Sequence, residues 1–214
     1  MEAVVQQLLE QRVVGILRLP QSDLALQALE VAIEHGLRVV EVTMTTPNAL
    51  EILREARRRW DGKALVGAGT VLSALEAQAV IDAGAQFVVS PIVDAGMVEA
   101  ALRADVPPIP GAFSPTEIVH ACRLGAPIVK IFPAATLGAA FFQEVKAPLP
   151  QIPLMAVGGL HAHNAAEFLH AGADMVGVGS ALFPKAAILA GELEGVAVTA
   201  KTLAALRHLR IGHV

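Results

Sequence analysis

The sequence predicts a (β/α)8 barrel, the TIM-barrel fold, built as one domain over residues 1–214 with an extra helix at its N-terminus. Eight short runs rich in β-branched residues recur along the chain, and successive runs begin 20 to 26 residues apart. Each gap holds a segment with helical periodicity, long enough for the crossover between two parallel strands. A length of 214 residues is at the small end for such a barrel and is short for two domains.

The expected elements follow one another with little space between them. The expected strands span 13–19, 39–45, 64–70, 87–91, 107–113, 128–134, 153–159 and 175–180. The expected helices between them span 23–36, 47–60, 75–85, 95–105, 114–126, 138–147 and 163–173. Two further helices, at 2–12 and about 194–210, lie outside the eightfold pattern. Left-handed glycine stops are expected at Gly36, Gly84, Gly125 and Gly172.

Closure of the barrel depends on the segment 107–113, which is the weakest strand candidate. Its prolines cannot donate to a strand ladder, so they are expected at a strand start or at a sheet edge. About six strands instead of eight would favour an open, doubly wound sheet. The count of eight therefore decides between the two architectures.

Composition and charge argue against several classes of protein. Hydrophobic residues make up 54% of the chain and charged residues 17%, which is typical of a densely packed α/β domain. The net charge of −4 gives no electrostatic reason to expect a nucleic-acid or membrane partner. The first residues do not resemble a signal peptide, and the single cysteine, Cys122, indicates a reducing compartment. We therefore expect a soluble cytoplasmic protein in which Cys122 is a small buried residue.

A lysine stands in the apolar run "APIVKIFPAA", residues 126–135. Burial of an ammonium group is costly, and the usual response is a lowered pKa that leaves the amine neutral and nucleophilic. Strand alternation places Lys130 on the same face as Ile128 and Phe132. The alternative is a structural ion pair between Lys130 and Glu41 inside the barrel, because such pairs also perturb pKa values.

Polar residues are expected at the carboxyl ends of the strands, where TIM barrels carry their active sites. These residues are Arg18, Glu41, Thr43, Thr45, Thr70, Ser90, Lys130, Gly158, Gly159, Gly179 and Ser180. Alternation places Arg18 on the face of Ile16, and Glu41 on the face of Thr43 and Thr45. If these faces point inward, a lysine, a carboxylate and an arginine converge in one pocket. A carboxylate beside a neutral amine can serve as the general acid/base of imine chemistry.

Two of the remaining polar residues, Arg18 and Thr70, have two interpretations each. Arg18 is either a guanidinium fork for a substrate carboxylate or a surface residue that caps the strand. Thr70 either donates its hydroxyl group to the same substrate or caps the next helix.

The glycine turns after the last two strands are typical of phosphate binding through backbone N–H groups. His161 and His163 are expected to open a helix, so we predict no metal site. The segment 54–60, "REARRRW", is interpreted as a solvated helix face above a packed tryptophan.

Seven stretches together resemble the 2-keto-3-deoxy-6-phosphogluconate (KDPG) aldolases, which often also act on 4-hydroxy-2-oxoglutarate. The stretches are "VVEVTMTTP", "LVGAGTVLS", "GAQFVVSP", "PPIPGAFSPTE", "VKIFPA", "MAVGGL" and "VGVGSAL". The resemblance covers almost the whole chain and implies a class I aldolase domain on a (β/α)8 barrel, without metal or cofactor and usually trimeric. The implied substrate is a small phosphorylated 2-keto acid, cleaved to pyruvate and glyceraldehyde 3-phosphate.

The resemblance also implies roles for individual residues. Lys130 matches the Schiff-base lysine, and Glu41 matches the general acid/base that works with a bound water. The positions that match the pyruvate pocket are Thr70, Pro91 and Phe132, and those that match the phosphate end are Gly159, Gly179 and Ser180. Some members carry an arginine four residues after the glutamate, where this chain has Thr45, and others carry it on the first strand, as Arg18 stands here. Arg18 is therefore expected to bind the carboxylate or the phosphate, and Thr43 is a further substrate-binding candidate.

Other functions fit parts of the same pattern. An aldolase for the galactonate epimer, or for unphosphorylated 4-hydroxy-2-oxoglutarate, would use the same lysine. An isomerase or epimerase would use Glu41 as base and Lys130 as an electrostatic group. A non-catalytic barrel that binds phosphorylated metabolites would retain the pocket without turnover.

Overall fold

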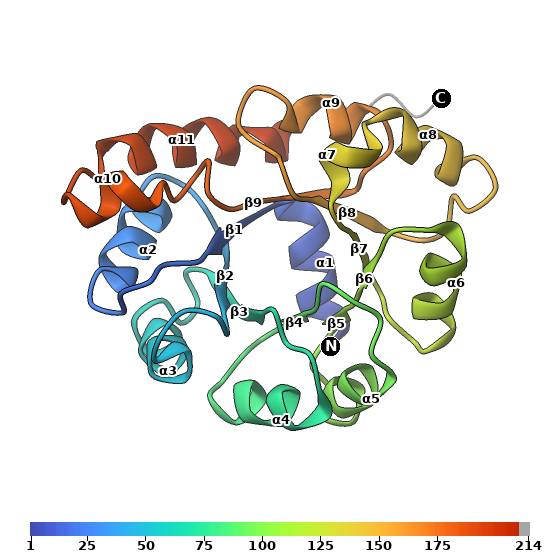
Figure 1. The fold of residues 1–214 in the computed structure, drawn as a ribbon, viewed down its shortest axis with the longest axis horizontal. Coiled ribbons are helices and arrows are strands. Elements are labelled where there is room, and N and C mark those ends of the chain that lie inside the picture. The colour runs from blue at the N-terminus through green and yellow to red at the C-terminus, as the bar shows by residue number, and fades with distance from the viewer. Residues whose placement is uncertain (210–214) are drawn as a thin grey trace.

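A ring of parallel strands surrounded by helices forms the protein, and the computed structural model describes residues 1–209 (Figure 1). The strands are β1 Val13–Leu17, β2 Val39–Thr43, β3 Leu65–Gly69, β4 Val88–Val89, β5 Pro108–Ile109, β6 Gly111–Ala112, β7 Val129–Ile131, β8 Leu154–Val157 and β9 Met175–Val178. They follow the order β5-β4-β3-β2-β1-β9-β8-β7-β6, and all pairs are parallel. The predicted TIM-like barrel with its N-terminal helix is confirmed.

The proline-rich segment closes the ring. Its first half, β5, pairs with β4, and its second half, β6, pairs with β7. Pro108 begins β5, Pro110 directly precedes β6, and these two strands stand first and last in the sheet order, so the prediction that the prolines lie at a strand start or at a sheet edge is confirmed. Proline lacks the N–H donor but keeps its carbonyl acceptor: Val88 N–H donates to Pro107 O at 3.1 Å, and Lys130 N–H donates to Pro110 O at 2.9 Å. Pro107 and Pro110 therefore join the two neighbouring strands as acceptors.

The helices match the expected pattern with three differences. They are α1 Glu2–Gln11, α2 Ala25–Glu34, α3 Ala49–Arg59, α4 Ala74–Asp82, α5 Ala95–Arg103, α6 Pro115–Arg123, α7 Ala134–Leu137, α8 Ala140–Lys146, α9 Ala165–His170, α10 Lys185–Leu189 and α11 Glu194–Ala204. The short helices α7 and α10 were not predicted. The last expected helix, 194–210, ends at Ala204 and continues as a 3-10 turn over Ala205–His208, and its final residue lies outside the described residues. The four predicted glycine stops have φ between 95° and 106°.

Two apolar layers hold the barrel together. Inward side chains from alternate strand positions, such as Val14, Val39 and Ile128, form one cluster inside the ring. The intervening positions pack against the surrounding helices. Leu8 of α1 joins the interior cluster and is fully buried there. Because α1 leads directly into the start of β1, it covers the amino-terminal end of the barrel and leaves the carboxyl end for the site.

Cys122 and Trp60 were both predicted to be buried. Cys122 is exposed, so the prediction of a buried cysteine was wrong: α6 buries Ile118 and Ala121, and Cys122 falls one residue beyond that face. Trp60 is buried at the end of α3, below its charged face, as predicted. Among residues 1–209, no helix combines the length and the apolar character that a membrane span requires.

Candidate active site

Lys130 and Glu41 project from β7 and β2 into the interior of the barrel. The structure leaves 5% of Lys130 and 1% of Glu41 exposed. Their strand neighbours at alternate positions, Ile128 and Val39, belong to the interior apolar cluster, so the predicted facing of both strands is confirmed. The interior thus holds an amine and a carboxyl group among aliphatic side chains.

Burial shifts both groups toward their neutral forms. Desolvation lowers the pKa of Lys130 below its ordinary value of 10.5; the nearby Arg18 charge adds to this shift, and Glu41 opposes it. Desolvation likewise raises the pKa of Glu41 above 4.5, against the opposing effects of Lys130 and Arg18. The Lys130 Nζ atom also lies 5.1 Å from the centroid of the Phe132 ring. The surroundings therefore favour a free, nucleophilic amine.

The two groups do not form a direct ion pair. No described lysine nitrogen other than that of Lys146 lies within 4.0 Å of a carboxylate oxygen, so Lys130 and Glu41 remain further apart than that. Glu41 Oε2 is buried and has no hydrogen-bond partner among the described residues. Buried polar atoms without partners are rare and call for an explanation. The interior salt bridge considered as an alternative is not formed, and both groups remain available to a ligand.

Arg18 and Thr70 meet at the mouth of the barrel. Arg18 follows β1, is exposed, and donates from Nη2 to Thr70 Oγ1 at 3.4 Å. Thr70 follows β3 with φ 60°, a left-handed conformation that is unusual for a β-branched residue and costs about 1–3 kcal/mol. Thr70 does not cap the next helix, because the N-cap of α4 is Ser73. Such strain at a strand end is typical of functional positions.

A group of threonine hydroxyls lies at the end of β2 and just after it. Thr43 Oγ1 lies 3.0 Å from Thr45 Oγ1 and 3.3 Å from Thr46 Oγ1, and the Leu19 N–H donates to Thr46 Oγ1 at 3.3 Å. Thr46 thus holds the end of β1 just after Arg18. Sequence reasoning missed Thr46, because it lies one residue beyond the expected strand.

The other predicted pocket residues come from neighbouring strand ends. Phe132 follows β7, is 37% exposed, and packs so close to Gly158 that a Cβ there would lie 3.2 Å from the ring. Pro91 follows β4, and its backbone packs against Gly111, where a Cβ would lie 2.5 Å from the Pro91 carbonyl group. Close packing therefore explains the glycine at position 111, whereas Gly158 also has a positive φ of 100°.

The predicted phosphate end is formed by β8 and β9, which are neighbours in the sheet. Gly158 and Gly159 follow β8 with φ 100° and 75°, and Gly179 and Ser180 follow β9. The Asn164 side chain donates to Gly159 O at 3.2 Å and accepts from the His161 N–H at 2.8 Å. Asn164 therefore fixes the glycine turn, which the sequence pattern did not reveal.

His161 and His163 lie in this turn, ahead of α9. Their ring centroids are 6.0 Å apart. Within the part of the chain that the structure describes, three or more His, Cys, Asp or Glu side chains do not come together as a metal site.

Comparisons with known proteins give a consistent result. The family model described as KDPG and KHG aldolase matches residues 4–199. A 2-dehydro-3-deoxy-phosphogluconate aldolase of Treponema pallidum is 36% identical over 194 residues, which cover 90% of this chain and 92% of the relative. A 2-dehydro-3-deoxy-6-phosphogalactonate aldolase of Escherichia coli is 32% identical over 171 residues, which cover 79% and 83%.

A solved structure is similar over almost its whole length. The KDPG aldolase of Legionella pneumophila, with pyruvate captured as a covalent carbinolamine, superimposes with a TM-score of 0.85 at 27% identity. The match covers 93% of this chain and 97% of that one.

Proposed function

Because the chain belongs to the KDPG and KHG aldolase family, we propose that it is a class I aldolase that cleaves 2-keto-3-deoxy-6-phosphogluconate to pyruvate and glyceraldehyde 3-phosphate. The observation that carries this proposal is Lys130, an amine buried in the barrel, driven toward its neutral form and free of a direct ion pair. A neutral amine at the carboxyl end of a barrel can attack a ketone.

The first half of the reaction builds the imine. The Lys130 nitrogen attacks the C2 ketone of the substrate and gives a carbinolamine after a proton moves from nitrogen to oxygen. Glu41, acting through a bound water, donates a proton to the C2 hydroxyl group, which leaves as water. The raised pKa of Glu41 suits this step, because the carboxyl group must hold a proton before it can donate one.

The second half breaks the carbon chain. Glu41, now ionised, removes the proton of the C4 hydroxyl group; the C3–C4 bond breaks, and its electron pair moves through C3 and C2 to the imine nitrogen. Glyceraldehyde 3-phosphate leaves, and an enamine remains. The enamine takes a proton at C3 from Glu41, and water then hydrolyses the imine to pyruvate and the free amine of Lys130.

The remaining residues bind the two ends of the substrate. We assign Thr70, Pro91 and Phe132 to the pyruvate part, with Thr43 as a further binding residue. The contact between Arg18 and Thr70 favours the substrate carboxylate as the ligand of Arg18. Gly159, Gly179 and Ser180 are assigned to the phosphate, since they follow neighbouring strands at the same end of the barrel.

Trapping of the covalent intermediate tests the proposal. Wild-type protein is incubated with pyruvate and borohydride, and its peptides are mapped by mass spectrometry. We expect a reduced pyruvyl group on Lys130 and on none of Lys63, Lys146, Lys185 and Lys201. The Lys130→Met variant serves as the control and should carry no adduct. An adduct on another lysine, or none in the wild type, would contradict the assignment.

The galactonate epimer is a second candidate substrate, because the Escherichia coli relative is named for it. A coupled lactate dehydrogenase assay compares turnover of the gluconate and galactonate epimers and of unphosphorylated 4-hydroxy-2-oxoglutarate. We expect the gluconate epimer to give the highest kcat/KM. An isomerase would give no borohydride adduct, and a non-catalytic binding protein would release no pyruvate.

We further propose that residues 1–214 are a single aldolase domain that assembles as a homotrimer in the cytoplasm. Exposed apolar side chains, including Leu75 at 85% and Ile92, follow β3 and β4 at one end of the barrel and offer a surface for association. Light scattering should give about three times the 22.3 kDa chain mass. A particle of a single chain mass would refute the trimer.

A further inference from the structure

We propose that Gly69 is a positioning residue of this site: the absence of a side chain at Gly69 creates the space in which the Glu41 carboxyl group lies. This inference rests on the proposed role of Glu41 as general acid/base. Gly69 is the last residue of β3, and β3 is the direct neighbour of β2, which carries Glu41.

A side chain at Gly69 would overlap the Glu41 carboxyl group. A Cβ atom on Gly69 would lie 1.6 Å from Glu41 Oε1, 2.2 Å from Cδ and 2.7 Å from Cγ. All three distances are below the 3.0 Å that real Cβ contacts keep, so the Glu41 side chain would have to move away from a methyl group here. Gly69 is not among the residues with positive φ, so its backbone accepts an L-residue. The Glu41 carboxyl group therefore occupies the space that a side chain at Gly69 would fill.

A second glycine on the same strand provides a contrast. A Cβ on Gly67 would lie 2.5 Å from three atoms of the Phe87 ring. The space at Gly67 is thus filled by an apolar ring, which is ordinary core packing. The space at Gly69 is filled by a carboxyl group whose Oε2 atom is buried without a partner among the described residues. Burial of such a group does not stabilise the fold.

A side chain at Gly69 should therefore affect Glu41 and Lys130 differently. Lys130 stands on β7, which does not pair with β3, so a methyl group at Gly69 displaces Glu41 and leaves the amine in place. Proton transfer should then fail while binding of the keto acid continues. General acid–base catalysis contributes about 10²–10⁴-fold, so we expect Gly69→Ala to lower kcat by that factor and to change KM little.

The test compares Gly69→Ala with Gly67→Ala as the matched control. Both changes add one methyl group at an inward position of β3, but only the first meets the carboxyl group. Gly67→Ala should lower the thermal midpoint and keep kcat within about 5-fold of the wild type. If Gly67→Ala does not fold, Gly177→Ala replaces it, because its Cβ would meet Ile16 and Val157 at 2.9 Å. A kcat of Gly69→Ala within about 3-fold of the wild type would overturn the inference.

A double-mutant cycle with Glu41→Ala separates positioning from general damage. Truncation of Glu41 removes the atoms that the new methyl group would meet. Gly69→Ala should therefore lower neither kcat nor the thermal midpoint further in the Glu41→Ala background. If Gly69→Ala alone does not fold, the double variant should fold. Additive losses in the cycle, or a double variant that is equally unfolded, would refute the proposal.

The borohydride experiment distinguishes a failure of the proposed function from a failure of the proposed role of Gly69. A wild-type protein without an adduct on Lys130 would refute the proposed function. An adduct on Lys130 together with normal turnover of Gly69→Ala would refute only the role of Gly69.

Discussion

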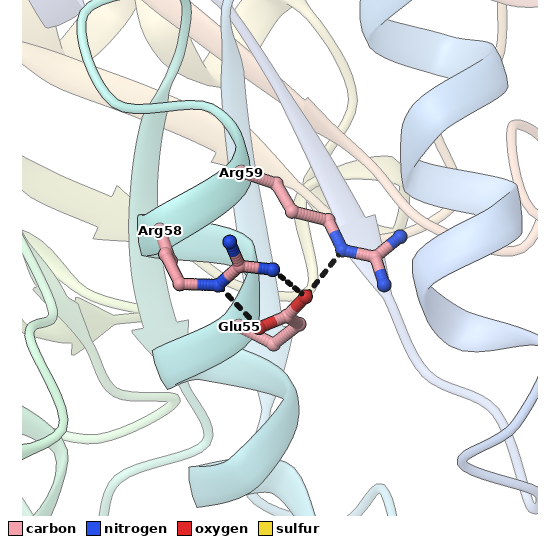
Figure 2. A network of polar contacts seen from close by, with 3 residues as sticks. All are labelled: Glu55, Arg58 and Arg59. Atoms are coloured by element: carbon pink, nitrogen blue, oxygen red, sulfur yellow. Dashed lines mark hydrogen bonds and ion pairs between the residues drawn. The ribbon is translucent and has the colours of Figure 1, made fainter.

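The protein places acidic and basic side chains together in two regions with opposite surroundings. Inside the barrel, Glu41 and Lys130 lie among aliphatic side chains without a direct ion pair, and burial raises the pKa of Glu41. On α3, Arg58 donates to both oxygens of Glu55 at 2.9 and 2.6 Å, and Arg59 donates to one of them at 2.6 Å (Figure 2). Hydrogen bonds from Arg58, and then from Arg59, lower the pKa of Glu55 to about 2.

The pKa values of these two glutamates are thus shifted in opposite directions. On the surface each charge is hydrogen-bonded and solvated, and such clusters contribute little to stability. In the barrel the charges lack these partners, and their neutral forms are favoured. A carboxyl group with a raised pKa and an amine with a lowered pKa are suited to exchange protons with a substrate. The cluster on α3 contains more charge, but it has no comparable reactivity.

Replacement of Lys130 should give the largest effect. Lys130→Met keeps the length and apolar stem of the side chain and removes the nucleophile, so aldolase activity should fall on the order of 10⁴-fold or more. The thermal midpoint should be no lower than that of the wild type, because an amine without a partner is removed from the interior. Circular dichroism and the coupled assay check both outcomes. Near-normal turnover, or a clearly lower midpoint, would argue against the account.

Replacement of Arg18 should give an intermediate effect. A hydrogen-bonded charge pair at an exposed site contributes about 1.5 kcal/mol, so Arg18→Ala should raise KM for the keto acid about 10-fold. The kcat should change less, because Lys130 and Glu41 stay in place. Steady-state kinetics with Arg103→Ala, which replaces an exposed arginine on α5, as the control check this. An unchanged KM would remove Arg18 from the substrate site.

The stability of the two regions should respond to pH with opposite signs. The folded pKa of Glu41 is raised, so the native state binds more protons above pH 4.5, and stability from this group falls as pH rises through its folded pKa. The pKa of Glu55 is lowered to about 2, so its contribution is present above pH 4.5 and is lost as pH falls toward 2. Urea unfolding of Glu41→Gln and Glu55→Gln across this range measures both. If the contributions of Glu41 and Glu55 to the free energy of unfolding changed with pH in the same direction, the comparison would be contradicted.

Removal of the surface cluster should give the smallest effect. Glu55→Gln should leave kcat and KM unchanged and shift the thermal midpoint at neutral pH by no more than about 2 °C. Differential scanning fluorimetry and the coupled assay check this. A loss of activity comparable to that of Arg18→Ala would show that α3 takes part in function.

Periodicity and alternation predicted the barrel and the inward facing of Lys130 and Glu41, because side chains on a strand alternate strictly. Local pattern could not predict features that depend on contacts through space. The need for glycine at Gly69 follows from a side chain on the neighbouring strand, and the role of Asn164 follows from a turn of two left-handed glycines. The helices α7 and α10 have 4 and 5 residues, too few to show a helical period.

Burial lowers the pKa of the Lys130 amine, and this shift favours its nucleophilic neutral form. Lysine labelled with ¹³C and ¹⁵N allows the Nζ group of each lysine to be titrated by NMR, and Lys130→Met identifies its signal by subtraction. We expect Lys130 to titrate clearly below the ordinary value of 10.5. A midpoint at or above 10.5 would contradict it.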